Sequence, residues 1–170
     1  MNKLQVKPGP RVSVSLYSQE LQSLRKRLHE LIAGRKFFII LVTGDRNWPW
    51  SARFIIGKAL QDVTRTLAPD VFIVLIEGGA KGADYCAKTY AEKCGWGVLE
   101  VEAHWDLYGN RAGPVRNRQM FELGQNVILA FHDDLSKSRG TKSMVGICTE
   151  SGSQVTLYGT DGKASTLGSE

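Results

Sequence analysis

Apolar residues follow two alternating patterns along most of the chain. Short runs that are apolar at nearly every position are typical of parallel strands buried on both faces, and they occupy residues 37–42, 71–76, 98–101, 127–131 and 155–158. Apolar residues three or four positions apart predict amphipathic helices at residues 18–33, 51–67, 84–94, 114–123 and 141–150. The alternation predicts an α/β fold, a Rossmann-like open parallel sheet with helices on both faces.

The first predicted helix precedes the alternating pattern. Ser18 is its expected N-cap and Gly34 its expected stop. Its apolar stripe consists of Leu21, Leu24, Leu28, Leu31 and Ile32. This stripe needs a partner, either the chain's own sheet or a second copy of the chain. Because the later helices should already cover both faces of the sheet, we expect a homodimer or higher homo-oligomer.

The pattern divides the chain into three parts. Residues 1–36 hold the first helix, preceded by an arm at residues 1–15 that we expect to be flexible. Residues 37–158 form the domain, with a long polar loop expected at residues 104–113. Residues 159–170 are small and polar, and we expect this tail to be frayed. In the second predicted helix we expect the inward side chains to be Phe54, Ile55, Ala59, Leu60, Val63 and Leu67.

Composition fits one soluble globular domain. The chain has 170 residues, 42% hydrophobic and 23% charged, enough for a core without disulfides or metal. Cys86, Cys94 and Cys148 form no CxxC pair and the three histidines are scattered, so we expect free thiols and no metal site. The chain carries no signal-peptide stretch and no apolar run near the roughly 20 residues of a membrane span, so we expect a cytoplasmic protein. A net charge of +5 fits an anionic partner without distinguishing a nucleotide from a nucleic acid.

The candidate chemistry follows the predicted strands, at the edge where such sheets bind ligands. The first strand leads into Thr43, Gly44, Asp45, Arg46 and Trp48. Gly44 allows the backbone to approach a ligand, Arg46 can pair with a phosphate or carboxylate, and Trp48 can stack on a base. The alternative is an ordinary turn with a surface arginine.

The loop after the second strand is rich in glycine. Its candidate residues are Glu77, Gly78, Gly79, Lys81, Gly82, Ala83 and Asp84. The glycines should leave backbone N–H groups free to line an anion site beside a helix N-terminus. Asp84 either caps that helix or binds a ribose hydroxyl. The loop is neither a Walker loop nor a GxGxxG motif.

A third segment gathers aromatic, amide and guanidinium groups between a strand and a helix. Its candidates are His104, Trp105, Asn110, Arg111, Gly113, Arg116, Asn117 and Arg118. Three arginines within eight positions beside an asparagine favour a site for a polyanion or a charged nucleotide over a solvated surface.

Four motifs in order carry a family resemblance: TGDRNW, EGGAKGAD, HWDLYGNRAGPVRNRQM and SRGTKSM. They resemble the YspA-like branch of the SLOG superfamily, which also includes the LOG phosphoribohydrolases and the DNA-processing protein DprA. The resemblance adds Gly140 and Thr141 as a phosphate-binding step. In the LOG enzymes an arginine and a glutamate act together in cleaving an N-glycosidic bond. Arg116 or Arg118 can supply the arginine here, but the glutamate position aligns with Met144, which cannot move a proton.

We therefore expect non-catalytic binding of a nucleotide-derived, phosphate-bearing small molecule, with no cofactor. The resemblance implies a ligand of the NAD-derived or cyclic-nucleotide type. Because the YspA-like branch is common in phages, it also suggests a phage sponge that hides an immune signalling nucleotide. The first alternative is a nucleotide N-glycosidase or phosphoribohydrolase that uses Glu77 or Asp84 beside Arg116. The second is a DprA-like DNA-binding protein, which requires a basic strip with interleaved aromatics. The remaining interpretation is a structural remnant, a protein that keeps the fold but binds no ligand.

Overall fold

The computed structural model describes residues 11–169, so the first ten residues of the expected flexible arm lie outside the described part of the chain. The described residues form one six-stranded sheet in the order β3-β2-β1-β4-β5-β6. The strands are β1 (Phe37–Gly44), β2 (Phe72–Glu77), β3 (Gly97–Glu100), β4 (Val127–Phe131), β5 (Val155–Tyr158) and β6 (Ala164–Leu167). All neighbouring pairs are parallel except β5 and β6.

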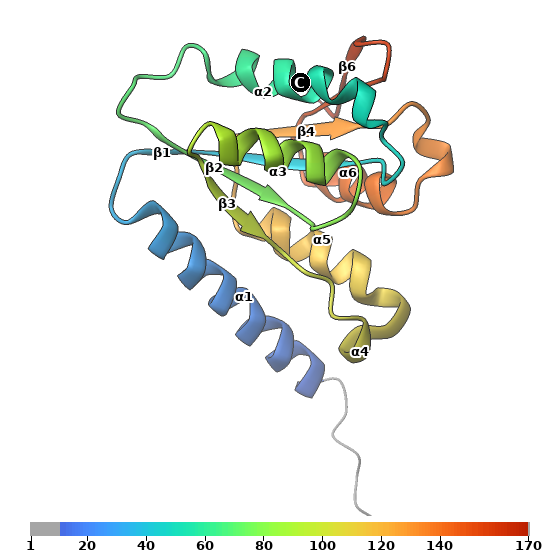
Figure 1. Cartoon of the computed structure of the whole chain (residues 1–170). Coiled ribbons are helices and arrows are strands. Elements are labelled where there is room, and N and C mark those ends of the chain that lie inside the picture. Colours follow the sequence, from blue (N-terminus) through green and yellow to red (C-terminus); the bar gives the residue numbers. More distant parts are fainter. Residues whose placement is uncertain (1–10, 170) are drawn as a thin grey trace, which may run out of the picture.

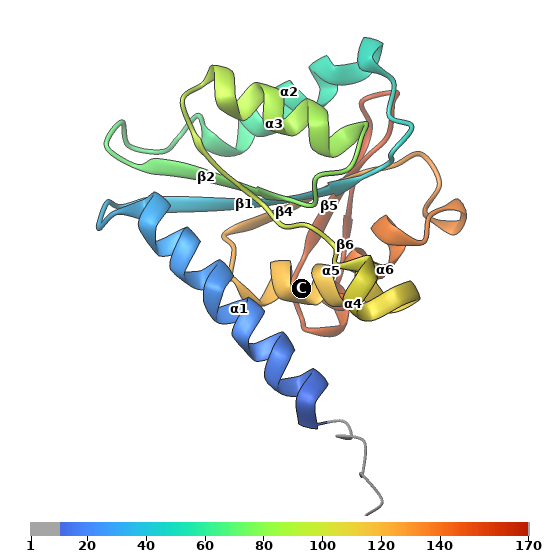
Figure 2. The same cartoon turned by 60° about the horizontal axis from the view of Figure 1, so that its bottom comes forward.

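Helices cover both faces of this sheet, as Figures 1 and 2 show. On one face lie α2 (Arg53–Thr64), which follows the short turn η1 (Trp50–Ala52), and α3 (Ala83–Lys93). On the other lie α1 (Arg11–Ile32), α5 (Ala112–Glu122) and α6 (Gly140–Glu150). The predicted Rossmann-like α/β fold is confirmed. Among the described helices, none has the length and apolarity to cross a bilayer.

The central strand β1 is apolar along most of its length because both of its faces are buried. Leu41 of β1 lies opposite Ile76 of β2 and Ile128 of β4, and its side chain has no exposed surface. Its chain neighbours Ile40 and Val42 belong to the core on the opposite face. A strand covered on both sides has no position at which a polar side chain would reach water.

Helix α1 differs from its prediction in two ways. It begins at Arg11, so Ser18 is not the N-cap and residues 11–15 are helical rather than a loose arm. Its leucine stripe is buried against the chain's own sheet, where Leu24 and Leu28 join the core beneath β2 and β3. Helices α5 and α6 lie over the other end of that face and leave this part for α1. The stripe therefore provides no reason to expect a dimer.

Three smaller expectations also need correction. The tail is not frayed, because residues 164–167 pair with β5 as strand β6 after a turn closed by the Gly162 N–H on the Gly159 carbonyl at 3.0 Å. The expected loop at 104–113 contains α4 (Trp105–Tyr108) and the turn η2 (Gly109–Arg111). Phe54 faces outward, with 67% of its surface exposed.

Candidate functional site

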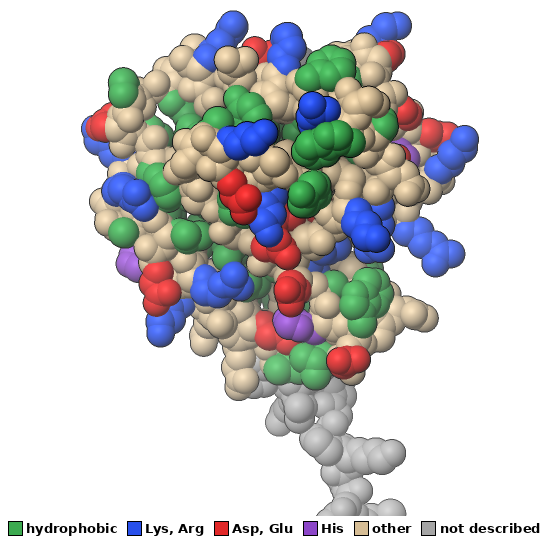
Figure 3. Space-filling model, viewed as in Figure 1, with side chains coloured by type: hydrophobic (Ala, Val, Ile, Leu, Met, Phe, Trp, Pro, Cys, Tyr) green, Lys and Arg blue, Asp and Glu red, His purple; other side chains and the backbone are tan. Residues whose placement is uncertain are grey.

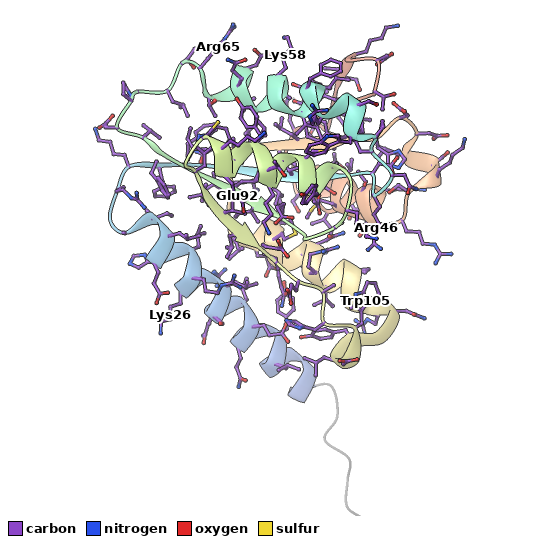
Figure 4. The ribbon with its side chains drawn as sticks, viewed as in Figure 1. Lys26, Arg46, Lys58, Arg65, Glu92 and Trp105 are labelled. Carbon is purple, nitrogen blue, oxygen red and sulfur yellow. The ribbon has the colours of Figure 1, made fainter. Side chains whose placement is uncertain are left out.

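A cavity of about 620 Å³ opens at the carboxyl edge of the sheet, beside β1 and β4. Strand order reverses between these two strands, and open α/β sheets bind their ligands at such a point. The wall combines the loop after β1, the start of α5, the start of α6 and Trp105 of α4. A second hollow of about 610 Å³ extends it over the loop after β2 and shares Arg46, Trp105 and Arg116 with it. Figure 4 shows Arg46 and Trp105 at this edge of the molecule.

The cavity wall is predominantly cationic. Within the described part of the chain, its charged side chains are Arg46, Arg116, Lys137 and Arg139, against Asp45 and Asp84. The excess of positive charge favours an anionic ligand. Among residues 11–169, no group of three His, Cys, Asp or Glu side chains is placed to hold a metal ion.

Two glycines bring the first and second loops together through their backbones. The N–H of Ala83 donates to the Asp45 carbonyl at 3.0 Å. A Cβ on Gly82, whose φ is +74°, would collide with that same carbonyl. A Cβ on Gly44 would collide with the side chain of Ala83 and approach the Phe131 carbonyl at 2.8 Å. Gly44 lines the cavity. Gly82 and Ala83 do not line it but pack against the loop after β1 that does.

Three N–H groups of the glycine loop, those of Gly78, Gly79 and Ala80, are already used by the chain's own carboxylates. Asp84 Oδ2 accepts from the N–H groups of Gly78 and Ala80, both at 3.2 Å. Glu77 Oε2 accepts from the Gly79 N–H at 2.6 Å. The expectation that these N–H groups are free to bind an anion is therefore wrong. Asp84 organises the loop that precedes its helix.

Both carboxylates are buried, and this changes their titration. Burial, reinforced by the charge of Asp84, raises the pKa of Glu77 to about 8. Burial also raises the pKa of Asp84 to about 6, although the two backbone N–H groups and Arg116 act in the opposite direction. Glu77 Oε1 and Asp84 Oδ1 have no hydrogen-bond partner among the described residues. A protonated Glu77 near neutral pH is consistent with this setting.

Arg116 connects the second loop to the third segment. Its Nη1 donates to the Gly78 carbonyl at 2.6 Å, and its Nε donates to Asn117 Oδ1 at 3.1 Å. Asn117 Nδ2 in turn donates to the Gly140 carbonyl at 3.2 Å. Burial lowers the pKa of the Arg116 guanidinium, and Asp84 partly opposes this. Arg116 therefore both lines the cavity and holds its walls together.

The start of α6 brings residues that were absent from the sequence-based site. Ser138 Oγ accepts from the Thr141 N–H at 3.0 Å, and the exposed Arg139 lies beside it. His132, at the end of β4, has its Nε2 3.8 Å from Asp45 Oδ2. Its Nδ1 accepts from the Asp134 N–H at 3.0 Å, so a neutral ring carries its proton on Nε2, toward Asp45. His132, Ser138 and Arg139 all follow β4. Their position after a predicted central strand could have identified them as candidate site residues from the sequence.

Comparison with known proteins supports the family. A family profile described as YspA, cpYpsA-related SLOG family matches residues 38–108. The chain is also 31% identical over 129 residues to the Gene 61 protein of Mycobacterium phage D29, an alignment that covers 71% of this chain and 95% of the phage protein. The chain belongs to this SLOG family. Arg116, Asn117 and the start of α6 lie beyond the residues that the family profile matches.

The SLOG fold also occurs in a solved structure. The DNA processing protein A (DprA) of Streptococcus pneumoniae superposes with a TM-score of 0.56 at 18% identity, over 72% of this chain. The chain spans half the length of the DprA chain. This likeness supports the fold.

The structure brings together twelve of the predicted site residues of this SLOG protein at the main cavity. They are Thr43, Gly44, Asp45, Arg46, Asp84, Trp105, Asn110, Gly113, Arg116, Asn117, Gly140 and Thr141. Gly78, Gly79 and Lys81 line the second hollow. Glu77 is buried behind both hollows. The cavity also includes Asn47, Ala80, Pro114, His132, Lys137, Ser138, Arg139 and Ser143, which the sequence reasoning missed.

Several predicted residues lie elsewhere. Trp48 is 4% exposed, donates its Nε1–H to the Ala52 carbonyl at 3.1 Å and packs on Phe131, so it is not available to stack on a base. His104 lines a separate cavity between α1 and the end of β3. Arg111 and Arg118 are exposed and line neither hollow.

Proposed function

We propose that this SLOG protein binds a nucleotide-derived, phosphate-bearing small molecule in the cavity and sequesters it without turnover. The observation that carries the proposal is the cationic wall around a cavity at the strand-order reversal. A volume of about 620 Å³ lies within the range typical of small-molecule sites. SLOG proteins generally bind nucleotide-related ligands, which agrees with this charge and position.

We place the phosphate at the start of α6. Arg139 and Lys137 are exposed there and can turn toward an anion, and the N-terminus of an 11-residue helix adds its positive end. Arg46 faces the same cavity from the loop after β1. Arg46 and Arg139 remain available because, unlike Arg116, they have no side-chain hydrogen bond or ion pair to the described part of the protein. Lys137 already pairs with Asp134, its Nζ 3.8 Å from Oδ2.

We place the base against Trp105. Trp105 is 53% exposed as a residue and lines both hollows, so it offers an aromatic side chain at their junction. Asn110 and Asn117, which line the same cavity, supply amide groups for polar contacts.

The residues of α6 support binding without turnover. Met144, at the position where the LOG enzymes carry a glutamate, has no exposed surface and belongs to the core under the sheet. No described carboxylate replaces it from α6 in the cavity wall. The similarity to a phage protein fits a role in removing a host nucleotide signal.

The proposal is tested by releasing small molecules from the purified protein by denaturation and identifying them by mass spectrometry. Affinity is then measured by calorimetry for the released compound, or for the four ribonucleoside 5′-monophosphates if none is released. Arg46→Ala and Arg139→Ala should each weaken binding at least about tenfold, the loss expected when a charged hydrogen bond of roughly 1.5–3 kcal/mol is removed. Arg65→Ala, an exposed arginine at the far end of α2 in Figure 4, should leave affinity unchanged. Unchanged affinity in both cavity variants would refute the proposal.

Hydrolysis is the second candidate, and one observation favours it. Asp84 lies in the cavity wall near Arg116, and burial raises its pKa to about 6, which brings its titration closer to neutral pH. A nucleotide N-glycosidase would release a free base from the bound nucleotide. Chromatography after long incubation detects that base, and its loss in Asp84→Asn with nucleotide affinity retained would assign the activity.

A further inference from the structure

Exposed aromatic side chains gather beside the cavity. Six large hydrophobic residues are exposed in the described chain, and five follow the first three strands at the carboxyl edge of the sheet. These five are Trp50, Phe54, Tyr85, Trp105 and Leu107, while Phe37 begins β1 at the opposite edge. Figure 3 shows hydrophobic side chains next to basic ones over the adjacent parts of α2 and α3. Scattered exposed aromatics are ordinary, but a cluster at a ligand site is not.

Three of these side chains form a connected surface, which we call the aromatic shelf: Trp50, Arg53 and Tyr85. The rings of Trp50 and Tyr85 have centroids 5.9 Å apart, and 48% and 56% of the two residues is exposed. Arg53 Cζ lies 4.7 Å from the centre of the Trp50 ring, and its Nη1 donates to the Trp50 carbonyl at 2.9 Å. The shelf thus presents two half-exposed rings, with the Arg53 guanidinium lying over the Trp50 ring.

The shelf is continuous with the cavity along the chain. Asn47, which lines both hollows, is three residues before Trp50, so their Cα atoms are at most about 11 Å apart. Tyr85 directly follows Asp84 of the cavity wall. Arg46 faces the cavity at the same end. The wall residues Asn47 and Asp84 therefore lie within three residues of the two rings of the shelf.

We propose that the aromatic shelf is a second nucleotide subsite, for a base joined through a phosphate linkage to the nucleotide in the cavity. This rests on the proposed function and deepens it, because the ligand then contains at least two nucleotide units. Stacking on the exposed rings suits any base, and Arg53 with Arg46 supplies the positive charge for the linking phosphate. Aromatic rings interleaved with arginines are the arrangement by which proteins hold consecutive nucleotides.

The test compares ligands of increasing length on the full chain. Affinities are measured by calorimetry for the nucleoside 5′-monophosphates, for the corresponding dinucleotides pNpN and for 5′-phosphorylated ten-residue oligonucleotides. The two shelf variants are Trp50→Ala and Tyr85→Ala, and the matched control is Phe37→Ala, an aromatic of similar exposure at the opposite edge. Thermal denaturation of each variant confirms that it folds.

We expect the second nucleotide unit to strengthen binding between about 5- and 100-fold, the range for one stacked base. Trp50→Ala and Tyr85→Ala should remove this gain and leave mononucleotide affinity unchanged, while Phe37→Ala should change neither. If the oligonucleotide binds no more tightly than the dinucleotide, the ligand is a dinucleotide. If it binds more tightly, the ligand is a nucleic-acid strand. The shelf binds a base in both cases.

If mononucleotides bind but the second unit adds nothing, or its gain survives in both shelf variants, the second subsite is refuted and the proposed function stands. If no nucleotide of any length binds, both proposals fail.

Discussion

Gly82 is the residue whose substitution should disturb the site most without removing any functional group. Its φ of +74° and ψ of −121° form a combination that side chains rarely allow, and a Cβ would meet the backbone of Asp45 and Arg46. We expect Gly82→Ala to cost more than about 3 kcal/mol of unfolding free energy and to abolish ligand binding, as measured by urea denaturation and calorimetry.

Gly95 provides the matched control for this substitution. Its φ of +71° is similar, but nothing lies within 4 Å of the Cβ it would carry. Gly95→Ala should therefore cost only the backbone strain, about 1 kcal/mol. Equal losses of unfolding free energy in Gly82→Ala and Gly95→Ala would contradict this, because they would show that the backbone of Asp45 and Arg46 moves away from a Cβ at position 82 without cost.

Arg116 combines a binding and a structural contribution. Arg116→Ala removes the donor to the Gly78 carbonyl and a positive charge that acts on Asp84, so we expect a loss of about 1–3 kcal/mol in unfolding free energy together with loss of ligand binding. Arg118→Ala, an exposed position on the same helix, should change stability by no more than about 0.5 kcal/mol. Denaturation and calorimetry on both variants test this, and normal binding by Arg116→Ala would exclude its guanidinium from the site.

Glu77 should make stability depend on pH. Its pKa is raised to about 8 in the folded protein, so between the unfolded value near 4.5 and about 8 the native state binds more protons than the unfolded state. The contribution of Glu77 is fully present below pH 4.5, and stability is lost as the pH rises toward 8, by on the order of 1–4 kcal/mol.

Glu77→Gln tests this dependence, because the amide oxygen can still accept from the Gly79 N–H. Urea denaturation between pH 5 and 9 should show a smaller fall for this variant than for the wild type, and the variant should be the more stable of the two at pH 9. Parallel pH curves would contradict the assignment of a raised pKa to Glu77.

At the scale of elements, α1 is part of the fold of its own chain. Leu28 is 7% exposed and packs in the core with strand residues, so we expect Leu28→Ala to cost about 2–5 kcal/mol. The exposed neighbour His29 serves as control, since His29→Ala should cost little. Light scattering should give the same mass for Leu28→Ala and wild type. A lower mass with unchanged stability would place the stripe between two copies instead.

The elements also differ in how far the sequence determined them. Strands β4 and β5 match their predicted bounds, because an apolar run bounded by polar residues leaves little freedom in a doubly covered sheet. Strand β6, with sequence ASTL, has no such run and exists through its pairing with β5. The sequence left two partners open for the apolar stripe of α1, the chain's own sheet or a second copy, because periodicity identifies an apolar face without identifying its partner.

The candidate site was predictable as a location rather than as a set of contacts. Loops after parallel strands meet at one edge in any sheet of this kind, so most predicted residues reached the cavity. Residue type did not separate Trp48, which is buried in the core, from Trp105, which is half exposed at the cavity. Nor did it reveal that Glu77 and Asp84 occupy the N–H groups of the glycine loop. Both depend on side-chain directions that only the packed molecule fixes.

At the scale of the whole molecule, those occupied N–H groups bear on how quickly a ligand is captured. The loop after β2 holds its shape through Asp84, Glu77 and Arg116 with no ligand involved. Association then requires no ordering of that loop, and its rate depends on diffusion and on attraction of an anion toward the cationic wall. A protein that removes a signal must reach it before the signal's receptor does. A cationic cavity whose second loop is held by its own side chains favours early capture, and the duration of binding then depends on the exposed arginines at its rim, Arg46 and Arg139.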